Sequence, residues 1–215
     1  MYEASNAVEF FDMVGKTEWN QDLQRTLVHW IGIRDLDEVL DVGCGAGHFV
    51  LRLAQRAQAV TGLDSSAEMV RLAGLQAEDN QVKNTEFALG SVTNLPVPSE
   101  RFDLVTVVNL LFMFRRLDAP IAELLRVLRP QGQIIVLDPS DALNPWAAQN
   151  YCDEHNLRDF ERESLLSFAT AAARFGPIAA SQFTAAVENA HGRVVDTALW
   201  MGGLVRIYRI VHAGL

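Results

Sequence analysis

Three glycines at alternate positions, Gly43, Gly45 and Gly47, lie between a short apolar run and a stretch with helical spacing. Glycine allows a sharp backbone turn and lets a ligand approach the main chain without a Cβ in the way. The dinucleotide pattern G-x-G-x-x-G would require a glycine at position 48, where this chain has His48. The segment therefore predicts a ligand-binding turn between a strand and a helix, with a ligand other than a dinucleotide.

Two carboxylates accompany the glycine turn. Asp41 stands two residues before Gly43, where it would repel a pyrophosphate bound at the helix N-terminus. The ammonium and sulfonium groups of S-adenosylmethionine would instead be attracted to it. Asp64 ends the next strand-like run, 23 residues later, and is well placed to accept both hydroxyls of a ribose. The alternatives are a tight turn that binds nothing and an Asp64 that only neighbours a helix cap.

These residues belong to a regular alternation of strand-like and helix-like segments. The expected strands in the first two-thirds of the chain are 38–42, 59–63, 85–89, 102–108 and 133–137. The expected helices are 22–31, 48–57, 67–76 and 120–128, the last of them stopped by Pro130 and Gly132. Such alternation predicts a parallel sheet with helices on both faces, in which ligands bind beyond the carboxyl ends of the strands.

The last third of the chain has a different pattern. Residues 144–174 are polar and helix-rich, and 182–189 predict a further helix. Residues 193–199 and 204–211 predict two strands joined across a Gly-Gly pair, which is typical of an antiparallel hairpin. The expected fold class is therefore α/β: a Rossmann-like, mostly parallel sheet of seven strands, with helices on both faces and a C-terminal antiparallel hairpin.

We expect one domain over residues 1–215. Its expected parts are an N-terminal helical cap (1–35), a ligand-binding core (36–139), a helical insertion with a further helix (140–190) and the hairpin (191–215). The net charge of −9 and the scattered 18 Lys and Arg residues argue against nucleic-acid and anionic-membrane partners. Two cysteines and a start without a secretory pattern favour a cytoplasmic protein, which we expect to be a monomer or homodimer.

Further stretches occur in the motif order of a known family. They are Val39–Phe49, Gly90–Pro98, Arg101–Val105 and Arg126–Gly132. Over roughly half of its length, from Val39 to Pro139, the chain resembles the class I S-adenosylmethionine-dependent methyltransferases, in particular the small-molecule type.

The resemblance implies S-adenosylmethionine as the cofactor and S-adenosylhomocysteine as the product. It implies this set of cofactor-binding residues: Asp41, Gly43, Cys44, Gly45, Gly47, Asp64, Ser65, Met69, Gly90, Ser91, Val92 and Asn109. Within the set, the backbone of the glycine turn would hold the methionine part, and Asp64 would bind the ribose. Met69 would pack on the adenine ring, the Val92 N–H would reach a ring nitrogen, and Asn109 would face the transferred methyl group.

The acceptor side is less defined by the sequence. Aromatic and histidine side chains are candidates for the pocket wall, with ordinary core packing as the alternative: Tyr2, Phe10, Phe11, Trp19, Trp146, Tyr151 and His155. The first four are expected before the first helix. A mostly apolar wall would suit a small organic acceptor. His48 is expected to face outward from the start of its helix.

Methyl transfer is an in-line displacement, so the enzyme mainly aligns the nucleophile and excludes water. A general base is needed only if the acceptor loses a proton, and no catalytic residue or metal ligand is assigned. The predicted function is methyl transfer from S-adenosylmethionine to a small organic acceptor. A serine at position 91, where the family often has an acidic residue, and the absence of a histidine in 111–114 leave room for a cofactor-binding protein without transfer. A nicotinamide-dependent oxidoreductase and a protein or RNA methyltransferase are further alternatives.

Overall fold

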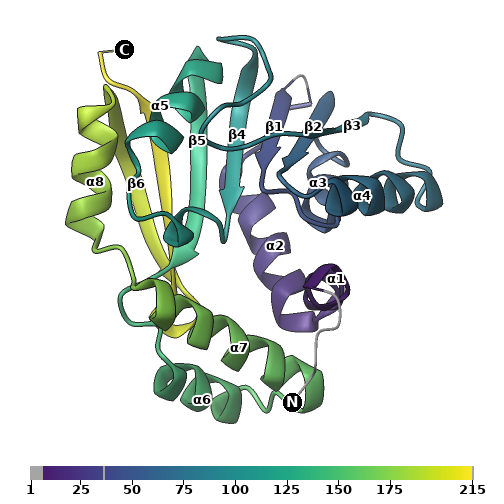
Figure 1. Cartoon of the computed structure of the whole chain (residues 1–215), viewed down its shortest axis with the longest axis vertical. Helices are drawn as coiled ribbons and strands as arrows, with labels where there is room; N and C mark the ends of the chain where they lie inside the picture. Colours follow the sequence, from purple (N-terminus) through teal and green to yellow (C-terminus); the bar gives the residue numbers. More distant parts are fainter. Residues whose placement is uncertain (1–6, 36, 215) are drawn as a thin grey trace. The chain divides into compact units, whose positions relative to one another are not determined.

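The computed structural model describes residues 7–35 and 37–214, and the chain divides into an N-terminal unit (residues 1–91) and a C-terminal unit (residues 92–215) (Figure 1). The described helices of the N-terminal unit are α1 (Ala7–Lys16), α2 (Glu18–Ile31), α3 (His48–Leu53) and α4 (Ala67–Asp79). Its strands are β1 (Glu38–Val42), β2 (Ala59–Asp64) and β3 (Thr85–Leu89). Tyr2, one of the expected pocket aromatics, lies outside the described residues.

The three strands of the N-terminal unit are parallel. Val39 of β1 pairs with Val60 of β2, and Val60 pairs with Thr85 of β3. The side chains of Val39, Leu40 and Val42 are buried, as expected for a parallel strand covered on both faces. All three strands therefore bring their carboxyl ends, and the loops that follow them, to the same edge of the sheet.

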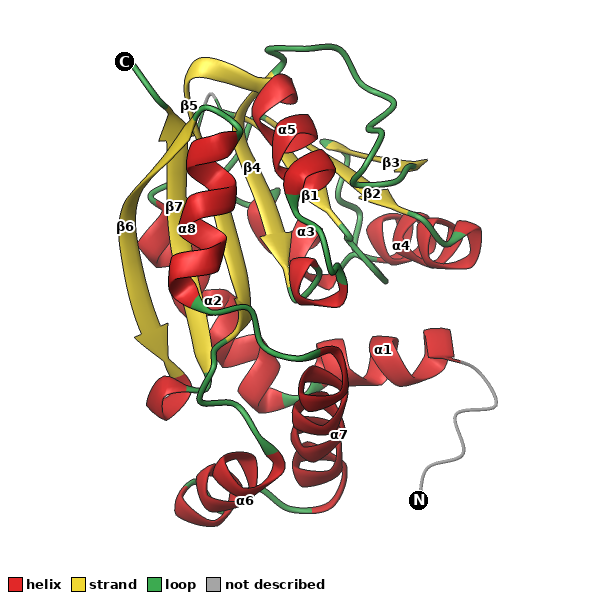
Figure 2. Ribbon diagram, turned by 60° about the vertical axis from the view of Figure 1, so that its left-hand side comes forward, coloured by secondary structure: helices red, strands yellow, loops and turns green. Residues whose placement is uncertain are grey.

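The C-terminal unit contains the rest of the sheet (Figure 2). Its strands are β4 (Phe102–Val108), β5 (Leu128–Pro139), β6 (Gly192–Trp200) and β7 (Val205–His212). Its α-helices are α5 (Asp118–Val127), α6 (Pro145–Glu154), α7 (Asp159–Phe175) and α8 (Ala180–Asn189), with short 3-10 helices at η1 (Leu111–Met113) and η2 (Met201–Gly203). Strand β4 is parallel to β5, whereas β7 is antiparallel to both β5 and β6.

The strand order is β3-β2-β1-β4-β5-β7-β6 in a seven-stranded sheet. The expected fold class, a mostly parallel Rossmann-like sheet that ends in an antiparallel hairpin, is confirmed. No helix among the described residues is both long enough and apolar enough to span a bilayer.

Two expected boundaries are wrong. Phe10 and Phe11 do not precede the first helix, because α1 already covers Ala7–Lys16, and Trp19 lies in the first turn of α2. Helix α5 ends at Val127, before Pro130 as expected, but β5 begins at Leu128 and not at residue 133, so Pro130 lies inside the strand. The register of β5 against β4 shifts between Phe102 and Leu104, and proline is tolerated at such irregularities.

Candidate cofactor site

The glycine turn between β1 and α3 adopts a conformation that requires glycine. Gly43, Gly45 and Gly47 have φ angles of 79°, 53° and 86°, in the left-handed region that side chains disfavour. A Cβ at Gly47 would lie 2.9 Å from the Cβ of Ala73, whereas a Cβ at Gly45 would meet nothing within 4 Å. The N–H groups of Gly43 and Cys44 donate to the carbonyl of Leu63, which holds the turn against β2. The turn is thus fixed from behind and open at Gly45.

Asp64 at the end of β2 joins this turn to the start of α4. Its Oδ2 accepts the N–H of Gly45 at 2.9 Å, and its Oδ1 accepts the N–H of Ser66 at 2.9 Å. The hydroxyl of Ser66 caps α4 by accepting from the N–H of Met69. Each carboxylate oxygen has a second lone pair, so Asp64 retains the capacity to accept a hydroxyl group.

The electrostatic environment of the turn is negative. Burial raises the pKa of the Cys44 thiol, and the carboxylates of Asp41 and Asp64 raise it further. Because the two carboxylates disfavour a negative charge on Cys44, they also disfavour an anionic ligand at the turn. The electrostatic potential at the turn therefore favours a positively charged ligand. Asp41 itself is only 3% exposed. The turn therefore fits a cationic ligand, such as one with a sulfonium and an ammonium group, better than a pyrophosphate.

The other expected cofactor residues of the N-terminal unit lie on β2–α4 and after β3. Met69 is buried on α4, whereas Ser65 and Ser91 are exposed. The N–H of Gly90 donates to the backbone carbonyl of Asp64 at 2.9 Å. The structure thus brings Gly90 to the end of β2, next to the residue expected to bind the ribose.

Val92 and Asn109, the remaining expected cofactor residues, belong to the C-terminal unit. Val92 is 4% exposed. Asn109 follows β4 with a φ of 56°, and its N–H donates to the carbonyl of Leu137 at 2.7 Å. Its Oδ1 is buried and has no hydrogen-bond partner within the described parts of the chain. Because buried acceptors are nearly always satisfied, this atom is a candidate for contact with a ligand.

Asp138, at the carboxyl end of β5, is a feature that the sequence analysis missed. Its Oδ1 accepts the N–H of Leu110 at 3.0 Å, and its buried Oδ2 has no partner among the described residues. Burial raises the pKa of this carboxyl to about 8, against the opposing effect of the N–H groups of Leu110, Phe112 and Leu111. A carboxylate that ends an apolar strand, as Asp64 also does, was the available sequence signal.

The expected acceptor residues are distributed over both units. In the N-terminal unit, Phe10 is half-buried on α1, and Trp19 is 7% exposed and has the environment of a core residue. In the C-terminal unit, Trp146 is 73% exposed, and the rings of Tyr151 and His155 stack with centroids 4.0 Å apart. The structure therefore joins Tyr151 to His155 and assigns Trp19 to the core.

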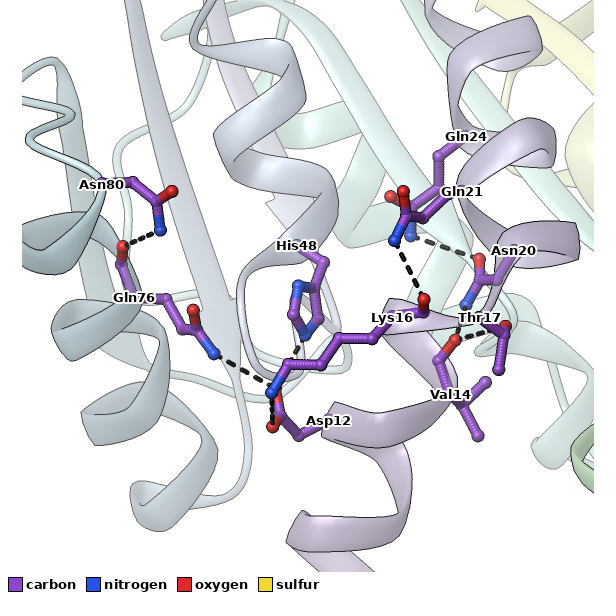
Figure 3. Close-up of polar contacts among 10 residues, drawn as sticks. All are labelled: Asp12, Val14, Lys16, Thr17, Asn20, Gln21, Gln24, His48, Gln76 and Asn80. Atoms are coloured by element: carbon purple, nitrogen blue, oxygen red, sulfur yellow. Dashed lines mark hydrogen bonds and ion pairs between the residues drawn. The ribbon is translucent and has the colours of Figure 1, made fainter. Parts of the chain in front are cut away.

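His48 does not face outward, contrary to the expectation. Its Nε2 lies 2.8 Å from Oδ1 of Asp12 on α1, and its side chain is 19% exposed (Figure 3). The partner is 36 positions away in the sequence, so helical periodicity could not reveal it. Among residues 7–35 and 37–214, no cluster of three or more His, Cys, Asp or Glu side chains could hold a metal ion.

Comparison with known proteins gives consistent matches. The family model described as a methyltransferase domain matches residues 33–185. The uncharacterized methyltransferase YcgJ of Bacillus subtilis is 33% identical over 131 residues, 60% of this chain and 52% of that protein. Its crystal structure gives a TM-score of 0.65 at 19% identity, covering 90% of this chain and 100% of that one.

Two further matches differ in what they act on. The 23S rRNA (uracil(1939)-C(5))-methyltransferase RlmD of Haemophilus influenzae is 41% identical over 68 residues, 32% of this chain and 16% of that protein. The magnesium protoporphyrin IX methyltransferase ChlM of Synechocystis, solved with bound S-adenosylhomocysteine, gives a TM-score of 0.66 at 17% identity over 93% of this chain and 84% of that one. The sequence matches thus span about half of the Bacillus relative and a sixth of the Haemophilus one.

A Rossmann-like sheet with a three-glycine turn after its first strand and a carboxylate at the end of its second defines a protein that binds a nucleoside-containing ligand. The family match makes the class specific. This chain belongs to the methyltransferase-domain family of class I S-adenosylmethionine-dependent methyltransferases.

Proposed function

We propose that this protein transfers the methyl group of S-adenosylmethionine to a small organic acceptor. The observation that carries the proposal is the open glycine turn, which is hydrogen-bonded to Asp64 and lies in the negative field of Asp41 and Asp64. When bound, the cofactor supplies a methyl group on a sulfonium sulfur that is already activated for displacement. The residues of the chain then have to bind it, orient it and keep water away.

Each proposed cofactor residue has a role that its chemistry permits. Asp64 accepts the ribose hydroxyls with its remaining lone pairs, and Asp41 provides negative potential behind the turn. The absence of a Cβ at Gly45 lets the methionine part approach the backbone. Met69 offers an apolar surface to the adenine. In the C-terminal unit, the buried Oδ1 of Asn109 has no partner among the described residues, which keeps Asn109 as a proposed cofactor contact.

A small acceptor agrees with the charge of the chain. The net charge of −9 opposes approach to a polyanion, and Arg and Lys are spread along the sequence. The rRNA-modifying relative matches over a sixth of its own length, so its substrate does not carry over. Phe10, Trp146, Tyr151 and His155 stay as proposed acceptor contacts, and a cytoplasmic monomer or homodimer remains the proposed state.

A second function, cofactor binding without transfer, is favoured by the loop after β4. In this loop, Phe112 packs edge-to-face against Phe168 and Phe175 of α7, with ring centroids 5.9 and 5.8 Å apart. An aromatic side chain in this position cannot remove a proton from an acceptor. The two functions differ in one product, because only the enzyme forms S-adenosylhomocysteine when an acceptor is added.

Isothermal titration calorimetry tests cofactor binding directly. We expect S-adenosylhomocysteine to bind and NAD to give no heat. Asp64→Asn should weaken binding by roughly 10- to 100-fold, since it removes a charge-assisted acceptor worth about 1.5–3 kcal/mol. Asp79→Asn, at the exposed end of α4, is the matched control and should bind within about twofold of the wild type, in line with the small effect of exposed surface substitutions. Equal affinities for the Asp64 variant and the wild type would contradict the assigned site.

Mass spectrometry with a panel of small hydroxyl, amine and thiol acceptors then separates transfer from binding alone. A mass increase of one methyl group in an acceptor supports the enzyme. Binding of S-adenosylmethionine with no methylated product across the panel would favour the second function.

A further inference from the structure

One carboxylate on α1 connects three helices of the N-terminal unit. Oδ1 of Asp12 lies 2.8 Å from Nε2 of His48 on α3 and accepts from Nε2 of Gln76 on α4 at 3.2 Å (Figure 3). Its Oδ2 accepts from Nζ of Lys16, one turn further along α1, at 2.6 Å. The Asp12 side chain is 15% exposed, so these partners replace most of its water.

The Asp12 carboxylate is ionised in this arrangement. Burial by itself would raise its pKa, but the hydrogen bonds from Lys16 and His48 outweigh that effect and hold the pKa below its ordinary value of 3.8. Partly buried, charge-assisted hydrogen bonds of this kind are stronger than contacts on an open surface. Asp12 is therefore a fixed connection between helices and not a solvated side chain.

The surface of α1 is shaped to receive the imidazole of His48. Gly15, one turn after Asp12, is buried, and a Cβ at this position would lie 2.8 Å from Cγ of the His48 ring. The missing side chain lets the ring lie directly on the helix while its Nε2 reaches Asp12. Glycine costs about 1 kcal/mol in a helix interior relative to alanine, so its presence here has a packing reason.

The two partners of Asp12 on other helices belong to the helices that follow the cofactor-binding loops. His48 is the first residue of α3 and follows Gly47, the last glycine of the turn. Gln76 lies on α4, the helix whose first turn is tied to Asp64 and carries Met69. Asp12 therefore holds both helices that leave the cofactor-binding loops.

The contacts of α2 do not depend on Asp12. The carbonyl of Val14 accepts from the Thr17 hydroxyl at 2.7 Å and from the Asn20 amide at 3.1 Å, which fixes the turn from α1 into α2 (Figure 3). Separately, Nε of Arg52 on α3 donates to Oε1 of Gln24 on α2 at 3.2 Å. Removal of the Asp12 carboxylate should therefore free α1 from α3 and α4, while the end of α1 stays joined to α2 and α2 stays docked on α3.

We propose that Asp12 is a positioning residue that couples the docking of α1 to cofactor binding at the glycine turn. The proposal rests on the proposed function, because it needs a ligand at that turn. Docked α1 holds His48, which follows the turn, and Gln76 of α4, and so keeps the turn and α4 in their binding arrangement. Because coupling between two events is reciprocal, cofactor binding must in turn hold α1 in place.

The test compares Asp12→Ala with Lys16→Met in the full chain. Lys16 contacts the same carboxylate but lies on α1 itself, so its loss breaks no contact between helices. We expect Asp12→Ala to weaken S-adenosylhomocysteine binding roughly 5- to 20-fold, and Lys16→Met to change it less than twofold. If the alanine variant does not fold, Asp12→Asn, which keeps the shape and removes the charge, takes its place.

Hydrogen exchange of the α1 amides supplies a readout that a purely structural role would not change. S-adenosylhomocysteine should slow the exchange of residues 7–16 in the wild type and in Lys16→Met, but not in Asp12→Ala. Equal affinity of Asp12→Ala and wild type, or α1 exchange that ignores the ligand in the wild type, would overturn the coupling alone. A wild type that binds no S-adenosylhomocysteine would overturn the proposed function and this inference with it.

Discussion

Asp138 should make the stability of the protein fall between pH 5 and pH 8. Burial raises the pKa of this carboxyl from 3.8 to about 8 in the folded state. In the unfolded chain the carboxyl is ionised above about pH 4, so the folded state binds one proton more throughout this window. The stabilisation that this carboxyl contributes is fully present below its pKa in the unfolded chain, and it is lost as the pH rises toward its pKa in the folded state. At about 1.4 kcal/mol per pH unit, three units amount to at most about 4 kcal/mol.

Asp138→Asn isolates this effect because an amide does not titrate. The free energy of unfolding of the variant, minus that of the wild type, should rise by up to about 4 kcal/mol from pH 5 to pH 8. Urea unfolding followed by tryptophan fluorescence measures it, and any constant effect of the amide cancels in the comparison. Asp141→Asn is the control: Asp141 is 61% exposed and pairs with Arg206, and loss of such an exposed pair should change the free energy of unfolding by less than about 1 kcal/mol at either pH. A difference for Asp138→Asn that is the same at both pH values would refute the reasoning.

Two further predictions concern packing and loop anchoring. Arg126 donates to two backbone carbonyls of the loop after β3 and pairs with Glu123. Arg126→Met should therefore lower the free energy of unfolding, measured by urea titration, by about 2 kcal/mol. A loss under about 0.5 kcal/mol, the range of neutral surface changes, would contradict this prediction. A Cβ at Gly132 would lie 2.8 Å from the carbonyl oxygen of Asp103, so Gly132→Ala should cost about 1–3 kcal/mol. Gly74→Ala on α4, where a Cβ meets nothing within 4 Å, should instead be neutral or stabilising. Equal changes in melting temperature for the two alanine variants would show that the close approach of Gly132 to Asp103 does not determine stability.

The strands could be predicted from the sequence because their signals are local. Each of 38–42, 85–89 and 102–108 is a short run bounded by polar or glycine residues, and each matches an observed strand. Helix α1 lies inside the expected helical cap of residues 1–35, but its bounds and its docking could not be found in this way. It is ten residues long, and its docking depends on the contact of Asp12 with His48, which no periodicity connects.

The candidate site likewise combines residues with a local sequence signal and residues whose properties only the fold reveals. The glycine turn and the carboxylate that is hydrogen-bonded to it were predictable because a turn with positive φ needs glycine at fixed positions, and Asp64 follows at the distance typical of the carboxylate proposed to bind the ribose. Asp138 was missed because its unusual property, a carboxyl that keeps its proton near neutral pH, comes from burial and not from its neighbours in sequence. Trp19 was a candidate for the pocket wall with core packing as the alternative, because the sequence does not show which aromatic side chains are buried; in the structure it is 7% exposed.

The position of β7 has a consequence for how the C-terminal unit can be assembled. This strand follows β6 in the chain but lies between β5 and β6 in the sheet. Until residues 205–212 have left the ribosome, β5 and β6 both present open backbone edges, which are templates for pairing with other chains. Nascent or truncated chains that stop before Val205 should therefore depend on chaperones, whereas in the full chain β7 pairs with the facing edges of both β5 and β6.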